Sequence, residues 1–577
     1  MYDKLSKIEK YIFDGMALFL VLFYSYSALV VPAATQYHKG VYVFVTYILV
    51  FLVYKSKSIF FRIVDYILLA LSAITVIYFM ANFEALNYRT GAETQTDGII
   101  AMIGVLIGIE VARRAVGTVF VIIGAVLLTY GVFGPYAPEL LMHPGGSFME
   151  IANTCFYKND GVFGIMADVL ATYVLLFVIF GAFLEKSGAQ KFFIDLPVVL
   201  VGHRTGGPAK VAVIASALFG SISGSAIANT VSTGAFTIPL MKKVGFKPHV
   251  AGAVEPAASI GGMFMPPIMG AGGFIMAELT GIPYSKIMLI AIFPAMMYFF
   301  SVFVMVHYEA KIHNIRGEKS EESAMKIFKE GWYYILPLAV ITVLMIIGYD
   351  AGLSAVVGIL TCLVISWFKK ETRIDLAGMI DAARKGAESS LKIGATVGVI
   401  GIIIAMLTFS GLILTFADIV IGLAEGKLWL TILLIALASL ILGMGVPVTA
   451  AYLITAVVAV PALTHLGVNP IAAHMIVYWL SQDSNITPPV CIAAFAGAAI
   501  AEAHMWKTAF NSFKFAKFLY LAPFLFGYVP AFTLNGSSAD IIKAFIMIAI
   551  GTWMYSYFLS FAWFYSIRNR FAPAKAV

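Results

Sequence analysis

Two short polar clusters interrupt apolar stretches of the chain, and their side chains could bind an ion or a carboxylate. The first cluster, residues 220–225, reads Gly-Ser-Ile-Ser-Gly-Ser and places the hydroxyls of Ser221, Ser223 and Ser225 among glycine-flanked carbonyl groups. Hydroxyl and carbonyl oxygens suit a hard cation such as sodium. The free amides at a helix N-terminus suit a carboxylate. The first cluster is therefore predicted to bind an ion or a carboxylate substrate.

The second cluster places acidic and amide side chains directly before a pair of prolines. Asp483, Asn485 and Thr487 precede Pro488 and Pro489 in an otherwise apolar stretch. An aspartate inside a membrane is costly unless it is paired, hydrated or protonated. Asp483 is therefore a candidate for ion or proton coupling.

Glu255 is the matching acidic residue of the first half of the chain. It precedes Pro256 in an apolar stretch that breaks further on, at Pro266 and Pro267. This carboxylate could take part in coupling, or it could cap a helix or pair near the membrane interface. Both interpretations stay open on the sequence alone.

The composition is that of a helical membrane protein. Of the 577 residues, 61% are apolar and 12% are charged, whereas a soluble domain has roughly 45–50% apolar and roughly 25% charged residues. A helix crosses the bilayer with about 20 apolar residues, so the chain is long enough for more than a dozen spans. We therefore predict an all-α polytopic membrane protein that is not a soluble protein or a barrel.

The remaining composition points to neither an enzyme nor a cofactor protein. The net charge of +7 is typical of basic loops on one side of a bilayer and requires no nucleic acid. The three cysteines are isolated in apolar surroundings, which indicates a structural role. No P-loop pattern is apparent, so the energy for any transport must come from a gradient or from another subunit.

The basic residues predict which side of the membrane each loop occupies. Lys4, Lys7 and Lys10 precede the first span, Tyr11 to Val31, which lacks a cleavage site and is expected to stay in the membrane. The next basic groups follow after each further pair of predicted crossings, and two crossings return the chain to the side on which it started. Both termini are therefore predicted to be cytoplasmic. The predicted divisions are N-terminal helices over 1–135, an external linker over 136–160, and a larger helical region over 161–577 that contains a central loop over 311–330.

A re-entrant hairpin is the preferred interpretation of residues 209–240. Basic clusters flank this segment on both sides, and its apolar arms, 209–219 and 226–240, meet at the polar cluster 220–225. An eleven-residue helical arm reaches about 16 Å, near half the bilayer. Polar backbone at that depth is tolerated only inside protein or beside water. The alternative is a kink of small residues within a helix.

The two halves of the chain repeat the same order of elements. Gly220 and Gly443 lie 223 residues apart, and the two proline pairs lie 222 residues apart. Three predicted crossings between the halves invert the second repeat. The sequence therefore predicts two inverted repeats, about 161–310 and 388–510, with two re-entrant hairpins and two broken helices, as in a secondary transporter. Short segments before each hairpin, 192–201 and 416–423, are expected to lie at the interface as arms or connectors.

Several motifs resemble the large membrane subunit of TRAP transporters, the tripartite ATP-independent periplasmic carriers. They are Phe-Gly-Ser-Ile-Ser-Gly-Ser-Ala-Ile-Ala-Asn at 219–229, Gly-Met-Phe-Met-Pro-Pro-Ile-Met-Gly at 262–270 and Ile-Thr-Pro-Pro-Val at 486–490. The extra N-terminal helices resemble the small subunit fused in front, as in the TAXI branch. The resemblance implies an elevator mechanism, an organic anion substrate, a periplasmic binding protein that delivers it, and a driving sodium gradient.

The resemblance also implies which residues line the ion and substrate region. The predicted binding residues are Ser221, Ser223, Gly224, Ser225, Asn229, Ser259, Gly443, Gly445, Thr449, Asn485 and Thr487, with sodium possible at the hairpin tips. One segment departs from the family pattern, because Ile260-Gly-Gly-Met263 stands where the TAXI-like pattern has Thr-Gly-Gly-Gln. That change removes a hydroxyl and an amide. We therefore favour proton coupling through Asp483 or Glu255 over sodium coupling.

Three other functions are compatible with parts of the pattern. A carrier that works without a binding protein would use the same hairpins. An intramembrane enzyme could use Asp483, although no metal motif, aspartate pair or serine–base arrangement supports one. A channel is disfavoured because inverted repeats indicate alternating access.

Overall fold

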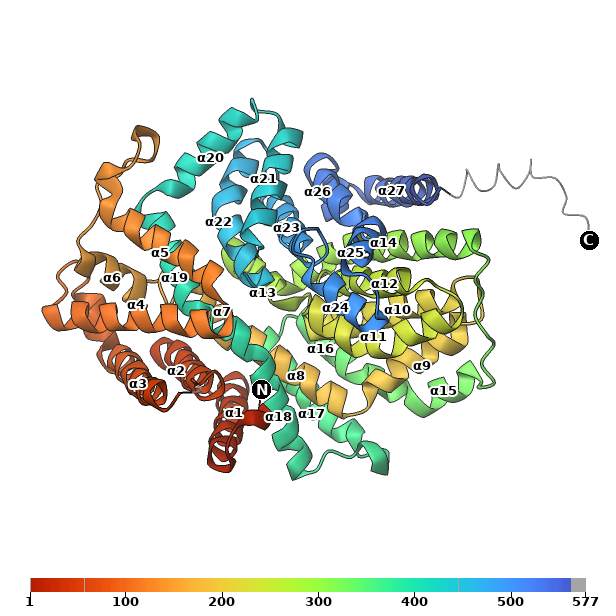
Figure 1. Cartoon of the computed structure of the whole chain (residues 1–577), viewed down its shortest axis with the longest axis horizontal. Helices are drawn as coiled ribbons and strands as arrows, with labels where there is room; N and C mark the ends of the chain where they lie inside the picture. Colours follow the sequence, from red (N-terminus) through yellow and green to blue (C-terminus); the bar gives the residue numbers. More distant parts are fainter. Residues whose placement is uncertain (1, 57, 445, 562–577) are drawn as a thin grey trace, which may run out of the picture. The chain divides into compact units, whose positions relative to one another are not determined.

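The structure is a computed structural model that describes residues 2–56, 58–444 and 446–561 (Figure 1). Within these residues every named element is a helix. Ten helices are long and apolar enough to cross a membrane. The prediction of an all-helical polytopic membrane protein is confirmed. Among the described residues the count is lower than a dozen because hairpin arms and half-helices, such as α10 (Gly207–Ser223) and α24 (Ile492–Ala501), are too short to count as spans.

The chain forms two compact units, each assembled from three separate segments. Unit 1 consists of Met1–Ser187, Phe274–Ile282 and Pro337–Val468, and unit 2 of Gly188–Gly273, Pro283–Leu336 and Asn469–Val577. The chain passes between the units after Ser187, within α13 (Gly270–Thr280), after Ile282, at the start of α16 (Leu336–Ile346) and after Val468.

Unit 1 contains the N-terminal helices, the crossings between the repeats and the second predicted hairpin. Its helices are α1 (Lys7–Leu29), α2 (Thr35–Val53), α3 (Ile59–Tyr88), α4 (Gln95–Ala115), α5 (Thr118–Phe133), α6 (Phe148–Tyr157), α7 (Ile165–Val169), the π-helix η4 (Leu170–Val174), α8 (Leu175–Lys186), α17 (Ala351–Ser366), α18 (Leu376–Gly394), α19 (Val397–Phe409), α20 (Leu412–Leu423), α21 (Leu428–Leu442) and α22 (Val448–His465). Short 3-10 turns are η1 (Tyr2–Lys4), η2 (Gly134–Tyr136), η3 (Glu139–Leu141) and η6 (Lys370–Thr372).

Caps and ion pairs define the helix ends of unit 1. A capping box begins α1, where Ser6 accepts from the Glu9 amide and Glu9 from the Ser6 amide. Glu110 on α4 accepts hydrogen bonds from both Arg113 and Arg114. Arg114 also lies 2.6 Å from Asp65, whose carboxylate is almost fully buried. The charged groups of these helix ends therefore have structural partners.

The centre of unit 1 is α19, which is buried along nearly its whole length. Gly398 of α19 packs against Gly108 of α4 so closely that a Cβ on Gly398 would lie 2.6 Å from the Gly108 Cα. Small residues permit such close approach of helix backbones in membranes. The N-terminal helices therefore pack directly against the second repeat within this unit.

Unit 2 contains the first hairpin and both proline breaks. Its helices are α9 (Ala189–Val201), α10 (Gly207–Ser223), α11 (Ala226–Lys243), α12 (Pro248–Gly262), α14 (Tyr284–Ile312), α15 (Ala324–Gly331), α23 (Pro470–Leu480), α24 (Ile492–Ala501), α25 (Met505–Phe515), α26 (Phe518–Tyr528) and α27 (Ser538–Leu559), with 3-10 turns η5 (Trp332–Ile335), η7 (Asp483–Asn485) and η8 (Pro530–Thr533). Helices α10, α11, α12 and α24 pack against one another in Figure 1.

Candidate ion and substrate site

The tip of the first hairpin is shorter than predicted. The arm α10 continues through Ser223, so the turn consists of Gly224 and Ser225 alone and not of all six residues 220–225. Gly224 has a positive φ of 60° and its amide donates to the Gly220 carbonyl, which ends the helix. Ser225 then caps α11 by accepting from the Ala228 amide. Local capping therefore replaces the open loop that the sequence predicted.

The three tip serines have different surroundings. Ser221 is buried and its hydroxyl donates to the Leu218 carbonyl at 2.9 Å. Ser223 is half-buried and makes only a long contact, 3.5 Å, to the Ser225 carbonyl. Each hydroxyl oxygen keeps lone pairs that could coordinate a cation.

Glu255 on α12 is fully buried between the two arms of the hairpin. Its carboxylate accepts hydrogen bonds from the hydroxyls of Ser216 on α10 and of Thr233 and Thr237 on α11. Ser216 and Thr233 share one carboxylate oxygen, and Thr237 alone contacts the other, at 2.5 Å. No ion pair of Glu255 occurs among the described residues, so three hydroxyl dipoles hold this carboxylate in place of a cation.

Sequence reasoning missed these three hydroxyl partners, although the pattern contained a signal for the two threonines. Asn229, Thr233 and Thr237 recur every four residues in the second arm and therefore share one helix face. A polar stripe in an apolar arm indicates a face that points to protein or water.

The first proline break is closed by tyrosine hydroxyls. The Tyr478 hydroxyl lies 2.7 Å from the Met263 carbonyl and 2.5 Å from the Met269 carbonyl. The Tyr284 hydroxyl lies 2.8 Å and 2.6 Å from the carbonyls of Pro267 and Ile268. Carbonyl groups freed by Pro266 and Pro267 thus meet side-chain donors, which the sequence did not predict.

The second proline break keeps unsatisfied polar atoms. Asp483 is 3% exposed, and its Oδ1 atom has no hydrogen-bond partner among the described residues. The adjacent Gln482 is fully buried and its Nε2 atom also lacks a partner there. Asn485 donates weakly to Gln482 at 3.5 Å, while Thr487 and Tyr520 share a hydrogen bond of 2.5 Å. An unmet acceptor and an unmet donor thus lie at adjacent positions.

Two further predicted residues present unsatisfied oxygens in the same unit. Asn229 is fully buried, and it donates to the Ser216 carbonyl while its Oδ1 atom has no partner among the described residues. The hydroxyl of Ser259, 1% exposed, also lacks a partner there. Amide and hydroxyl oxygens are suitable ligands for a hard cation. The described residues contain no group of three His, Cys, Asp or Glu side chains that could hold a metal ion.

Close glycine contacts bring the elements of this site together. A Cβ on Gly262 would lie 2.5 Å from the Gly220 Cα, and a Cβ on Gly224 would lie 3.1 Å from the Gly270 Cα. The first contact joins the hairpin to the end of α12, and the second joins its tip to the start of α13. Glycine at these positions allows the hairpin to reach the first proline break.

The predicted residues of the second hairpin belong to the other compact unit. Gly443 and Thr449 belong to unit 1, whereas the first hairpin and both proline breaks belong to unit 2. Gly445 lies outside the described residues. Ile260 and Met263, where the sequence departs from the TAXI-like pattern, are buried and supply apolar side chains in unit 2.

These elements define a multi-pass helical membrane transporter built on hairpins and broken helices. Residues 103–532 match the family model of the tripartite ATP-independent periplasmic transporter, DctM component. The chain belongs to this family, and its resemblance to the TRAP membrane component is confirmed. It is therefore a TRAP-type secondary transporter permease and not an enzyme. The fusion of a TAXI-type small subunit stays a prediction.

Several curated relatives are named as TRAP transporter large permeases. The 2,3-diketo-L-gulonate TRAP transporter large permease protein YiaN of Escherichia coli is 25% identical over 370 residues, which cover 61% of this chain and 83% of the relative. The C4-dicarboxylate TRAP transporter large permease protein DctM of Vibrio cholerae is 22% identical over 417 residues, covering 68% and 89%. The crystal structure of the Alcanivorax borkumensis YdaH transporter aligns with a TM-score of 0.47 and 17% identity, covering 71% of this chain and 97% of that chain.

Proposed function

We propose that this chain imports a small organic anion, a carboxylate or dicarboxylate, across the bacterial inner membrane by an elevator mechanism driven by a proton or sodium gradient. A periplasmic binding protein delivers the substrate. The observation that carries the proposal is that four of the buried polar atoms without hydrogen-bond partners among the described residues of unit 2 belong to predicted site residues or their neighbours, namely Asn229, Ser259, Gln482 and Asp483. Buried polar atoms are costly when unpaired, so their presence at broken helices favours a bound ion and substrate.

The substrate class rests on the chemistry of relatives and of this site. The two relatives named above carry 2,3-diketo-L-gulonate and C4-dicarboxylates by name, and both are carboxylates. Among the described residues, no hydrogen bond or ion pair joins a Lys or Arg side chain to the hairpin tip. Hydroxyls and helix N-termini, such as the start of α11 at Ser225, would therefore bind the anion, together with any bound cation.

Asp483 is the preferred coupling residue. Glu255 has hydroxyl partners within hydrogen-bond distance of both of its carboxyl oxygens. Asp483 instead keeps a buried oxygen without a partner, which a proton or a cation would satisfy. We therefore assign coupling to Asp483 and a positioning role to Glu255.

The experiment is uptake of radiolabelled organic acids into liposomes that contain this chain, under imposed proton or sodium gradients. Uptake that follows the proton gradient without sodium, and that is lost in Asp483→Asn, supports proton coupling. Asp418→Asn is the matched control because Asp418 is exposed on α20. Strict sodium dependence with Asp483→Asn still active would overturn the assignment and return coupling to the oxygens of Asn229, Ser259 and the tip serines.

The same assay separates the two carrier hypotheses. Uptake that requires the candidate binding protein supports a complete TRAP system. Equal uptake with and without that protein supports the alternative, a carrier that needs no delivery subunit. Failure of every substrate under both gradients, with correctly folded protein, would contradict the proposed transport activity itself.

A further inference from the structure

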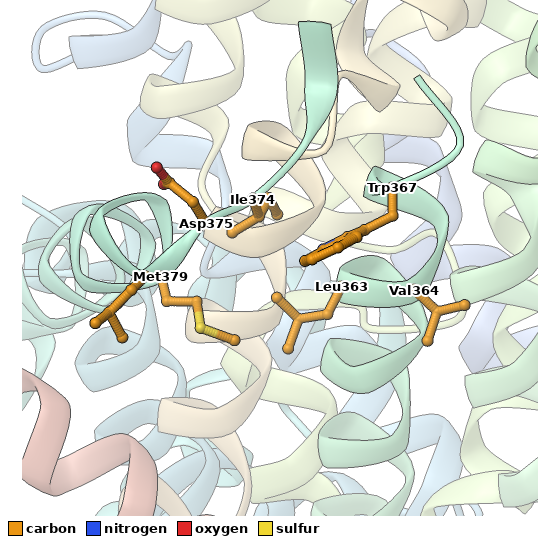
Figure 2. A pocket seen from close by; sticks show the side chains of 7 residues that line it. Leu363, Val364, Trp367, Ile374, Asp375 and Met379 are labelled. Atoms are coloured by element: carbon orange, nitrogen blue, oxygen red, sulfur yellow. The ribbon is translucent and has the colours of Figure 1, made fainter. Parts of the chain in front are cut away.

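A groove opens in unit 1 at the end of α17, where the chain turns into α18. Its volume is about 420 Å³, and its lining residues are Leu363, Val364, Trp367, Ile374, Asp375, Leu376 and Met379. Figure 2 shows Leu363, Trp367 and Met379 converging on the hollow, while the Asp375 carboxylate points away from it. The interior of the groove is therefore apolar.

The groove is a built feature of the fold. The Ser366 hydroxyl accepts from the Ile374 amide at 3.2 Å, and the Thr372 hydroxyl donates to the Ser366 carbonyl at 3.2 Å. The Asp375 carboxylate caps α18 by accepting from the Gly378 amide at 2.7 Å. These bonds fold the segment between the two helices back over the end of α17 and fix the groove walls.

Apolar side chains at the groove are strongly exposed. The exposed fractions are 63% for Val364, 57% for Trp367 and 72% for Leu376, and Phe368 beside them is 58% exposed. Such an apolar surface is stable where lipid covers it. Tryptophan is also enriched at the level of lipid headgroups. The end of α17 therefore fits the boundary between acyl chains and headgroups.

The turn between α17 and α18 contains three basic residues, Lys369, Lys370 and Arg373, together with one exposed acidic residue, Glu371. No ion pair of Lys369, Lys370 or Arg373 occurs among the described residues, and the Arg373 guanidinium stacks on the Trp367 ring at 3.5 Å from its centroid. The distribution of basic residues predicts that this loop lies on the cytoplasmic side, where anionic lipids give the membrane a negative surface. The rim is thus suited to a lipid phosphate.

We propose that this groove binds one anionic phospholipid, with an acyl chain against Trp367 and Met379 and the headgroup phosphate at Lys369, Lys370 and Arg373. The volume of the groove is in the range of small-molecule binding sites, which is about 300–1,000 Å³. The occupant is a lipid because the walls are apolar, the rim is basic, and the groove lies at the end of an apolar helix. Bound lipid would brace the α17–α18 turn, and α18 packs on α1 and α8 in the same unit.

The test is fluorescence quenching by phospholipids with brominated acyl chains, added to the purified full-length chain. Subtracting the signal of Trp367→Phe isolates the quenching of Trp367. We expect brominated phosphatidylglycerol to quench Trp367 at concentrations at least about tenfold lower than brominated phosphatidylcholine, since each basic residue adds attraction to an anionic headgroup. Equal quenching by the two lipids would overturn the proposal.

The rim is tested by removing its charge. The triple variant Lys369→Gln, Lys370→Gln and Arg373→Gln should abolish the preference for phosphatidylglycerol. The matched control, which is Lys319→Gln, Lys326→Gln and Lys329→Gln, removes the same charge from the exposed central loop and should keep that preference. The same loss in both triple variants would show a general charge effect and contradict a specific site. The lipid site would also be refuted if inorganic phosphate alone abolished the quenching by phosphatidylglycerol, or if a dimer of the chain buried Trp367 in the absence of lipid.

Discussion

The hydroxyl cage of Glu255 makes a stability prediction that distinguishes its two carboxylate oxygens. Thr237 is the only hydroxyl among the described residues that donates to Oε2, whereas Ser216 and Thr233 both donate to Oε1. Val has nearly the shape of Thr but lacks the hydroxyl. Thr237→Val therefore leaves one buried carboxylate oxygen without a donor, and Thr233→Val leaves the other oxygen with one donor.

The expected difference follows from the strength of hydrogen bonds to charged groups. Losing the last donor to a buried charged oxygen should cost about 1.5–3 kcal/mol of stability. Losing one of two donors should cost less, about 0.5–1.5 kcal/mol. We therefore expect Thr237→Val to lower stability more than Thr233→Val, although both threonines are almost fully buried on the same helix.

The assay compares thermal unfolding midpoints in one detergent and repeats each substitution in a Glu255→Gln background. Thr129→Val on α5 is the control because Thr129 is exposed and bonds only within its own helix. If the effect acts through the carboxylate, the extra loss in Thr237→Val should shrink in the Glu255→Gln background. Equal midpoints for the two threonine variants, or an undiminished loss without the carboxylate, would refute the reasoning.

Three other substitutions test the packing around the site and the fold. In Gly262→Ala the new Cβ would lie 2.5 Å from the Gly220 Cα, so the two backbones must move apart. Uptake by the folded variant should therefore fall more than about tenfold. Gly422→Ala is the control and should leave uptake unchanged, because nothing lies within 4 Å of a Cβ at that position. Arg114→Ala should cost about 3–5 kcal/mol because it strands a buried carboxylate, whereas Arg113→Ala, about half exposed, should cost at most about 1 kcal/mol by thermal unfolding. Tyr478→Phe removes the hydroxyl that contacts two carbonyls of the first break, so both the unfolding midpoint and uptake should fall.

Features set by local rules could be predicted from the sequence. The hairpin, the two breaks and the acidic residues follow from charge clusters, proline pairs and the near-constant offset between the halves. The structure gives the predicted interfacial arms as α9 (Ala189–Val201) and α20 (Leu412–Leu423), a few residues longer than expected. The tip was predicted too long because the capping geometry of Gly224 and Ser225 is not visible in composition.

Contacts between distant segments could not be predicted. Tyr478 lies more than two hundred residues from the carbonyls that it contacts, and in the sequence it is one of 28 tyrosines. The partners of Glu255 come from two arms that meet only when the hairpin folds. A single sequence contains the types of these residues but not their pairing.

The two proline breaks are equivalent in sequence but differ in how their polar groups are satisfied. At the first break, the hydroxyls of Tyr284 and Tyr478 each lie within hydrogen-bond distance of two carbonyls, so a side-chain donor is within reach of all four oxygens. At the second break, Gln482 and Asp483 keep a buried donor and a buried acceptor without partners among the described residues. Ligand binding costs less where polar atoms need not first give up a protein partner. A coupling ion or substrate group should therefore gain the most binding free energy at the second break. For this reason Asp483→Asn is the variant that tests transport, and Tyr478→Phe is the variant that tests the fold of the site.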